Sequence, residues 1–136
     1  MIRAIWAYLR QPDAYPDDWY RWMGGQAGHA AIIGGPLALI GVAAGIWVGI
    51  VGTLVGLAYW LGWEVLIQRG ADWRDSLDDA THVTLGASIT SLPFAFVPPA
   101  DHKAAAAAMG AVWLIWLAVL ASGIRKRLKG DDDGPI

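Results

Sequence analysis

The sequence predicts an all-α integral membrane protein built from four transmembrane helices. Of its 136 residues, 56% are hydrophobic and 16% are charged, whereas soluble domains carry about 25% charged residues. The mean hydropathy is +0.41. No Asp, Glu, Lys, Arg or His occurs between Ala30 and Trp63, and such a stretch cannot cover a soluble surface. Lipid is therefore the expected main solvent of this chain.

The apolar segments divide the chain into four expected spans. Residues 24–66 are too long for one crossing, because about 20 residues span the hydrocarbon core. We expect a helical hairpin there, with a tight turn near residues 43–46. A third helix is expected over residues 78–97, ended by a Pro-Pro pair. The fourth helix, over residues 104–124, is the clearest single span.

Positive charges test this count independently, because Lys and Arg are retained on the cytoplasmic side of a membrane. With four crossings, nine of the ten basic residues fall on one side and only Lys103 falls on the other. The nine are Arg3, Arg10, Arg21, Arg69, Arg74, Arg125, Lys126, Arg127 and Lys129. A single helix over residues 24–66 would split the ten as four against six. We therefore predict a multi-pass protein of the cell inner (cytoplasmic) membrane with both termini in the cytoplasm.

The chain divides into one membrane domain and two flanking segments. Residues 1–23 are expected to form a short amphipathic helix in the membrane interface. Residues 24–124 form the four-helix transmembrane domain. Residues 125–136 form a basic and then acidic cytoplasmic tail, for which disorder is the expectation. The net charge of −2 argues against a nucleic-acid partner, and the lack of cysteine excludes disulfides and thiolate chemistry.

Small and polar residues recur at helical spacing within the expected spans. The small ones are Gly34, Ala38, Gly41 and Gly45 in the first helix, and Gly45, Gly49, Gly52 and Gly56 in the second. We expect these two faces to close on each other, since missing side chains let backbones approach. The third helix carries a polar stripe of Thr81, Thr84, Ser88 and Ser91. Structural hydrogen bonding is the favoured interpretation of that stripe, because no charged residue continues it across the membrane.

Four crossings gather ionisable residues from three helices at the cytoplasmic face. The candidate catalytic residues are His29, Glu64, Asp75, Asp79 and His82. On a helix, Asp75, Asp79 and His82 share one face, and carboxylates beside an imidazole are suited to an acid–base pair. Glu64, Asp75, Asp79 and His82 are also candidate ligands of a divalent cation such as Zn²⁺ or Mn²⁺. No other cofactor is predicted.

A structural alternative explains the same residues without a site, and the sequence favours it. Ser76 followed by Asp79 is typical of a capping box, and acidic residues in a first helical turn complement the helix dipole. In this interpretation Glu64 pairs with Arg69 or Arg74, and His29 only forms a hydrogen bond within the bundle.

A group of motifs gives the chain a resemblance to known families. The motifs are Gly28-His29, Gly62-Trp63-Glu64, Trp73-Arg74-Asp75-Ser76-Leu77-Asp78-Asp79 and Gly86. Over residues 24–90 the chain resembles the small VanZ-like and YfiM-like membrane families, in which an early histidine, a glutamate and a Trp-x-Asp-x-x-x-Asp element occupy three successive helices. Gln68 departs from the VanZ-like pattern, because it follows Glu64 by four residues instead of three. The resemblance implies a bacterial or phage envelope protein, with an association to glycopeptide tolerance.

Three functions stay open at this point. The preferred one is a non-enzymatic membrane protein that associates with itself or with another membrane component, with a holin-like phage protein as a specific version. It is motivated by the glycine-rich faces, by Trp113 and Trp116 in the middle of the fourth span, and by the lack of a complete catalytic set. The second is an envelope factor with a metal or acid–base site, and the third is an accessory subunit of a larger membrane complex. The expected partners are the lipid bilayer and a second copy or another membrane protein.

Overall fold

The computed structural model describes residues 19–68 and 73–130, and within these ranges every regular element is a helix. The first rod runs through α2 (Trp19–Gly28), the π-helix η1 (His29–Gly34) and α3 (Gly35–Ala43). The second comprises α4 (Val48–Tyr59) and the π-helix η2 (Trp60–Val65). The third comprises α5 (Trp73–Ser91) and the 3₁₀ helix η3 (Leu92–Phe96). The short 3₁₀ helix η4 (Pro99–Asp101) then leads into α6 (His102–Gly130).

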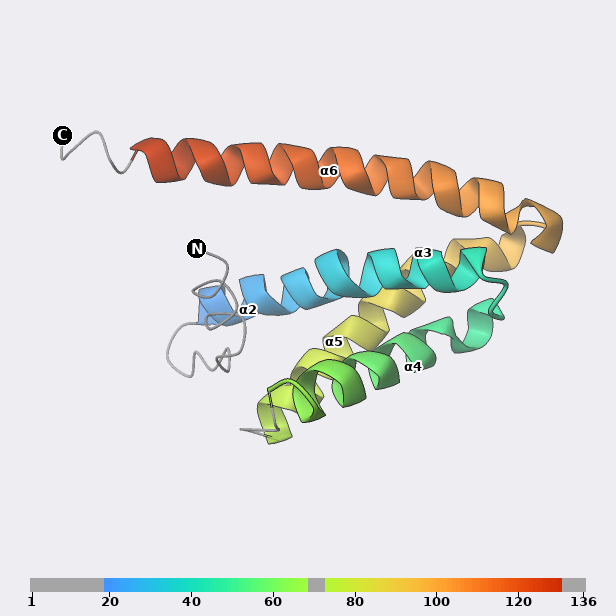
Figure 1. The fold of residues 1–136 in the computed structure, drawn as a ribbon, viewed down its shortest axis with the longest axis horizontal. Coiled ribbons are helices and arrows are strands. Elements are labelled where there is room, and N and C mark those ends of the chain that lie inside the picture. The colour runs from blue at the N-terminus through green and yellow to red at the C-terminus, as the bar shows by residue number, and fades with distance from the viewer. Residues whose placement is uncertain (1–18, 69–72, 131–136) are drawn as a thin grey trace.

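The four rods run back and forth between two ends of the molecule (Figure 1). One end holds the start of α2, the end of η2, the start of α5 and the end of α6; we call it the Glu64 end. The opposite end holds the α3–α4 turn and the start of α6, and we call it the Lys103 end. In this arrangement α5 packs against both α4 and the η1–α3 rod, while α6 lies along α3.

The expected hairpin and its turn are confirmed. α3 ends at Ala43, and Gly45 adopts the left-handed conformation, with φ of 84°. The N–H of Ile46 donates to the carbonyl of Gly41 at 3.0 Å, and that of Gly45 donates to the carbonyl of Val42 at 2.9 Å. These two bonds form a Schellman motif, in which glycine is favoured because it has no Cβ to strain. The turn therefore follows from a single glycine placed after the last helical residue.

Three of the helical rods are long and apolar enough to cross a membrane: Trp22–Ala43, Val48–Val65 and Pro99–Val119. The rod that begins with α5 does not meet this criterion. Its first two turns carry Arg74, Asp75, Asp78 and Asp79, which lower the hydropathy of the whole segment. The expected count of four helices is thus present in the described residues, and three of them have the composition of a span.

The small-residue faces of the hairpin close mainly on α5, so the expectation that they close on each other is wrong. A Cβ added to Gly52 would meet the side chain of Ser88, and one added to Gly56 would meet that of Thr84. Gly41 does face the hairpin partner, where Val51 lies 3.4 Å from its added Cβ. The physical reason is that α5 occupies the space between the two rods, so that their backbones approach α5 instead.

The backbones of η1 and α5 approach each other closely at two glycines. A Cβ added to Gly34 would lie 2.5 Å from the carbonyl oxygen of Val83. On the other side of the same crossing, a Cβ added to Gly86 would overlap the backbone of Ala30. The core continues along this seam through Ala38, Val51 and other apolar side chains that are almost fully buried: Val42, Val83, Ala87 and Phe94.

The third and fourth helices have boundaries that differ from the expected ones. The third helix begins at Trp73 instead of residue 78, and its α-helical part ends at Ser91, after which a 3₁₀ helix with Pro93 near its start replaces it. Proline lacks the N–H that an α-helix would need there. The fourth helix runs over 102–130 instead of 104–124, so its backbone continues through the basic residues. The expected interfacial segment falls mostly on residues 1–18, and the acidic end on residues 131–136, both outside the described residues.

α6 is the most peripheral helix and packs mainly on α3. Trp113 lies against Gly35, where a Cβ added to the glycine would come within 2.7 Å of the indole ring. Trp116 contacts Trp113 edge to face, with the ring centroids 5.2 Å apart. One of the two mid-span tryptophans is thus used in packing within the chain, and its neighbour is partly exposed.

Candidate polar site at the Glu64 end

The helical segments that carry His29 and Glu64 are both π-helical. His29 opens η1, and Glu64 lies in η2. The wide turns are seen in the i to i−5 bonds at their ends, where the Gly35 N–H donates to Ala30 and the Leu66 N–H donates to Leu61. Single π-helical turns are rare in proteins and frequent at functional sites. Both turns lie beside α5, and together they direct two rods toward the same helix.

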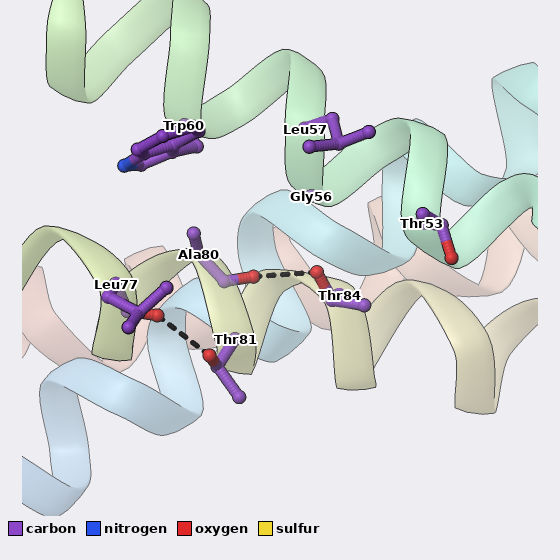
Figure 2. Close-up of a pocket in the computed structure, with 8 residues that line it drawn as sticks. All are labelled: Thr53, Gly56, Leu57, Trp60, Leu77, Ala80, Thr81 and Thr84. Carbon is purple, nitrogen blue, oxygen red and sulfur yellow. Dashed lines mark hydrogen bonds between the residues drawn. The ribbon is translucent and has the colours of Figure 1, made fainter.

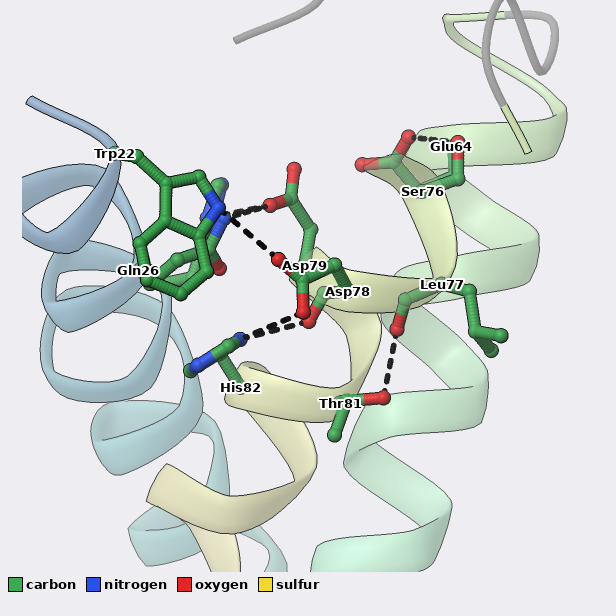
Figure 3. A network of polar contacts seen from close by, with 10 residues as sticks. Trp22, Gln26, Glu64, Ser76, Leu77, Asp78, Asp79, Thr81 and His82 are labelled. Carbon is green, nitrogen blue, oxygen red and sulfur yellow. Dashed lines mark hydrogen bonds and ion pairs between the residues drawn. The ribbon is translucent and has the colours of Figure 1, made fainter. Parts of the chain in front are cut away.

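Asp79 is the centre of the polar contacts between α5 and the first rod. The residue is only 3% exposed. Its Oδ1 accepts a hydrogen bond from Gln26 Nε2 at 2.7 Å (Figure 3). The same oxygen lies 3.2 Å from His29 Nδ1. The His29 ring also packs against Tyr59 of α4, with centroids 5.7 Å apart. Three rods therefore meet at this carboxylate and its histidine.

Glu64 forms the second buried contact, between η2 and α5. It is 1% exposed, and its Oε2 accepts a hydrogen bond from Ser76 Oγ at 2.7 Å (Figure 3). With its amide oriented to suit both neighbours, Gln68 donates to Glu64 Oε2 and accepts from Trp63 Nε1, each at 3.0 Å. The spacing of four between Glu64 and Gln68 thus brings the two side chains together on the end of η2.

A third group lies nearer the surface and is separate from the first two. Trp22 Nε1 donates to Asp78 Oδ2 at 3.2 Å, and its ring meets the edge of the His82 ring. His82 Nδ1 lies 2.9 Å from the backbone oxygen of Asp78 and 3.7 Å from its carboxylate. His82 therefore pairs with Asp78 one turn away and not with Asp79, although the sequence places it on the Asp79 face.

The capping interpretation of these acids is wrong, because α5 begins earlier than expected. Asp75 is the acidic residue in its first turn. Ser76 is buried inside the helix and donates to Glu64. Asp79 lies in the second turn and is bound by side chains of another rod. The alternative that treated Ser76 and Asp79 as a capping box therefore no longer explains why both are present.

Two oxygen atoms at this end have unused acceptor capacity. Among the described residues, Gln26 Oε1 and Glu64 Oε1 are buried and have no hydrogen-bond partner. A buried acceptor left in this state costs about 1–3 kcal/mol, so proteins usually supply a donor. Each of these two oxygens could therefore accept a hydrogen bond from a hydroxyl or amino group, one on each side of α5.

The predicted metal ligands do not form one cluster. Glu64 contacts Ser76, Asp79 contacts Gln26 and His29, and His82 contacts Asp78. Within the part of the chain that the structure describes, no three His, Cys, Asp or Glu side chains come close enough to hold a metal ion together. A bound divalent cation stays a prediction.

The polar stripe of α5 is used for hydrogen bonds to its own backbone. Thr81 Oγ1 donates to Leu77 and Thr84 Oγ1 donates to Ala80, at 2.7 and 2.8 Å (Figure 2). Ser91 Oγ donates to Ser88 at 3.1 Å. Thr81 and Thr84 line a groove of about 260 Å³ between α4 and α5 whose other walls are mainly apolar. Because both hydroxyls already donate to backbone carbonyls, they add little polar character to the groove.

Sequence reasoning missed two members of the site, Gln26 and Tyr59. Gln26 precedes His29 by three residues and so shares its helical face, which is a signal that the sequence does carry. The partner of both, Asp79, lies 53 residues from Gln26 in the chain. Tyr59 gave no such signal, because tyrosine near a span end is equally expected as an interfacial anchor.

Over residues 19–68 and 73–130, the structure is all-helical, with three helices apolar enough to cross a membrane and with two buried carboxylates at one end. Comparisons with protein-family models, with curated protein sequences and with solved structures find no match to this chain. The resemblance to the VanZ-like and YfiM-like families therefore stays a prediction.

Proposed function

We propose that this chain is a four-span protein of a bacterial inner membrane, of chromosomal or phage origin, with both termini in the cytoplasm. Its Glu64 end binds the polar head group of a membrane lipid or of a lipid-linked envelope precursor. The observation that carries the proposal is a pair of buried acceptors without a hydrogen-bond partner: Gln26 Oε1, beside the Asp79–His29 contact, and Glu64 Oε1, on the other side of α5.

The four-span topology is supported by the position of α5 within the bundle. Its Asp79 carboxylate accepts a hydrogen bond from Gln26 of the first rod, and its Ser76 hydroxyl donates to Glu64 of η2, so these polar groups meet neighbouring rods instead of lipid. The hydroxyls of Thr81 and Thr84 donate to the backbone of α5 itself. A helix too polar to cross a membrane alone can cross when other helices cover it. The basic residues outside the spans, nine against one, favour the Glu64 end as the cytoplasmic end.

The chemistry of the site favours a ligand rich in hydrogen-bond donors. Carboxylate and amide oxygens accept hydrogen bonds, so hydroxyl and amino groups of a sugar or of an amine-containing head group are the matching chemistry. The Asp79 carboxylate lies 3.2 Å from His29 Nδ1, so each can orient the other within the site. The site as proposed binds and orients a head group, and no bond-breaking step is required of it.

The test compares growth of cells that carry the protein in the presence of a glycopeptide antibiotic. We expect expression of the natural chain to raise the inhibitory concentration, and Glu64→Gln or Asp79→Asn to abolish the increase at equal membrane levels. Asp101→Asn, which removes a carboxylate at the Lys103 end, is the matched control and should behave as the natural chain. Equal tolerance in all four strains would refute the proposed site, and metal analysis of the purified natural chain would expose a divalent ion as the occupant.

Association with another membrane component is the second candidate, favoured by one feature of α6. On its outward side Val112, Ile115 and Val119 are 65%, 66% and 66% exposed, which leaves an apolar face for a second copy or a partner protein. The glycine faces no longer support this candidate, because α5 already covers Gly52 and Gly56. Crosslinking in native membranes from cysteines placed at 112 and 115 should trap a dimer or a partner.

A holin-like version of this candidate would in addition collapse the membrane potential abruptly when expression of the protein is induced.

A further inference from the structure

A second groove lies between α3 and α6, away from the polar site. It has a volume of about 560 Å³, within the range of about 300–1,000 Å³ that ligand sites occupy. One wall is formed by Leu39 and Ile40 of α3, and the other by the small residues Ala107, Gly110 and Ala111 of α6. The small side chains of α6 therefore create the space, and everything that lines it along its length is apolar.

One cation stands at the end of this apolar groove. Lys103, in the first turn of α6, is among the lining residues and is exposed. Across residues 19–68 and 73–130, no carboxylate forms an ion pair with Lys103. The apolar span of this rod covers Pro99–Val119, which places Lys103 close to one membrane interface. The groove thus combines an apolar channel with an unneutralised positive charge at its interfacial mouth.

The dimensions of the groove suit an acyl chain. From Lys103 to Leu117 it follows α6, a rise of about 21 Å at about 1.5 Å per residue. One leaflet accounts for half of a hydrocarbon core of about 30 Å. A chain that starts at the interface beside Lys103 can therefore lie in the groove over the full depth of its leaflet.

We propose that an anionic phospholipid occupies the α3–α6 groove, with an acyl chain along Gly110 and its phosphate on Lys103. Charge complementarity selects this occupant, since a lysine at a membrane interface attracts anionic head groups and its ammonium donates to phosphate oxygens. A second copy of the chain fits less well. Two parallel α6 helices related by a two-fold axis would bring their Lys103 side chains together, and like charges repel.

The first experiment measures head-group preference. The full-length protein, delipidated in dodecyl maltoside, is titrated with palmitoyl-oleoyl phosphatidylglycerol or phosphatidylcholine, and bound lipid is counted by native mass spectrometry. We expect phosphatidylglycerol to bind about fivefold more tightly, and Lys103→Gln to reduce it to the level of phosphatidylcholine. Asp101→Asn, a charge change beside the groove, should keep the preference. Equal binding of the two lipids by the natural chain would overturn the proposal, and so would a preference that survives Lys103→Gln.

The second experiment fills the groove. A Cβ added to Gly110 has Leu39 Cδ1 as its nearest neighbour, at 4.0 Å, so Gly110→Leu introduces no backbone clash and places its side chain in the groove. We expect it to weaken binding of both lipids, while Ala118→Leu, on the same helix but outside the groove, leaves binding unchanged. Glycerol phosphate without acyl chains should not compete; effective competition would indicate a phosphate site only. A dimer that excludes lipid and is lost in Gly110→Leu would identify a second copy as the occupant and overturn the proposal.

Discussion

The polar contacts of Asp79 are made with side chains of another rod, and the effect of substituting Asp79 on stability follows from these contacts. Its carboxylate is buried and holds both Gln26 and His29, whereas adjacent Asp78 is half-buried and holds Trp22. Removing one partner of a buried polar contact leaves the others unsatisfied in an apolar environment. Substituting Asp79 should therefore lower the free energy of unfolding much more than substituting the adjacent Asp78.

Asp79→Ala should lower the free energy of unfolding by about 1–3 kcal/mol. Asp79→Asn should cost less, because an amide oxygen still accepts from Gln26 Nε2. Asp78→Ala is the matched control and should change stability by less than about 0.5 kcal/mol. Thermal unfolding in detergent, followed by circular dichroism, measures all three variants. Equal destabilisation by the two alanine variants would contradict the central place given to Asp79.

The single residues also show how far the sequence alone leads. It singled out Glu64 and Asp79, because acidic residues near apolar spans are costly and stand out, and the structure buries both in contacts between rods. His29 lies 3.2 Å from Asp79, as expected. The other partners were not predicted: Asp79 also binds a glutamine 53 residues away, and Glu64 binds a serine that was expected to be a cap. Spacing predicts which residues share a helix face, but not which residue of another helix meets that face.

Between elements, the seam of η1 and α5 sets the packing of the bundle. Gly34 and Gly86 lie on opposite sides of one crossing, and each faces backbone atoms of the other helix. Backbone atoms cannot rotate aside as a flexible side chain can, so added volume must separate the helices. Dispersion contacts along the seam are the main attraction between helices in lipid, and they fall steeply with distance.

Gly86→Ala should therefore destabilise the fold by more than about 2 kcal/mol, an overpacking effect at the upper end of its usual range. Gly28→Ala is its control, because a Cβ there meets nothing within 4 Å and alanine has the higher helix propensity. It should be neutral or stabilising by up to about 1 kcal/mol. The yield and unfolding temperature of the two variants in the same detergent give the comparison. A neutral Gly86→Ala would mean that η1 and α5 are farther apart than described.

The elements follow from the sequence more closely than their contacts do. The hairpin turn was predictable, since Gly45 follows an apolar helix and supplies the left-handed residue that the Schellman motif requires. The glycine spacing also predicted close packing correctly. The helix that these glycines pack against was not predictable, because no feature of residues 34–56 indicates that a polar helix from later in the chain fills the space between the two rods.

For the whole molecule, the position of α5 determines both topology and site. If α5 crosses the membrane between the other rods, then Glu64, Asp79 and His29 gather at the cytoplasmic interface and Lys103 lies at the outer one. If α5 stays on one side, the three apolar rods alone cross, and the chain ends lie on opposite sides. Whether α5 crosses therefore determines on which side of the membrane the head-group site and the anionic-lipid groove lie.

A pair of topology reporters distinguishes these arrangements most directly. One reporter, fused after Ile136, and another, inserted near Asp101 between η3 and α6, are each read with an enzyme active only in the cytoplasm and with one active only outside it. Four crossings predict that the reporter after Ile136 is cytoplasmic and the one near Asp101 is external. A cytoplasmic reporter near Asp101 together with an external one after Ile136 would show that α5 does not cross, and would contradict the proposed four-span protein.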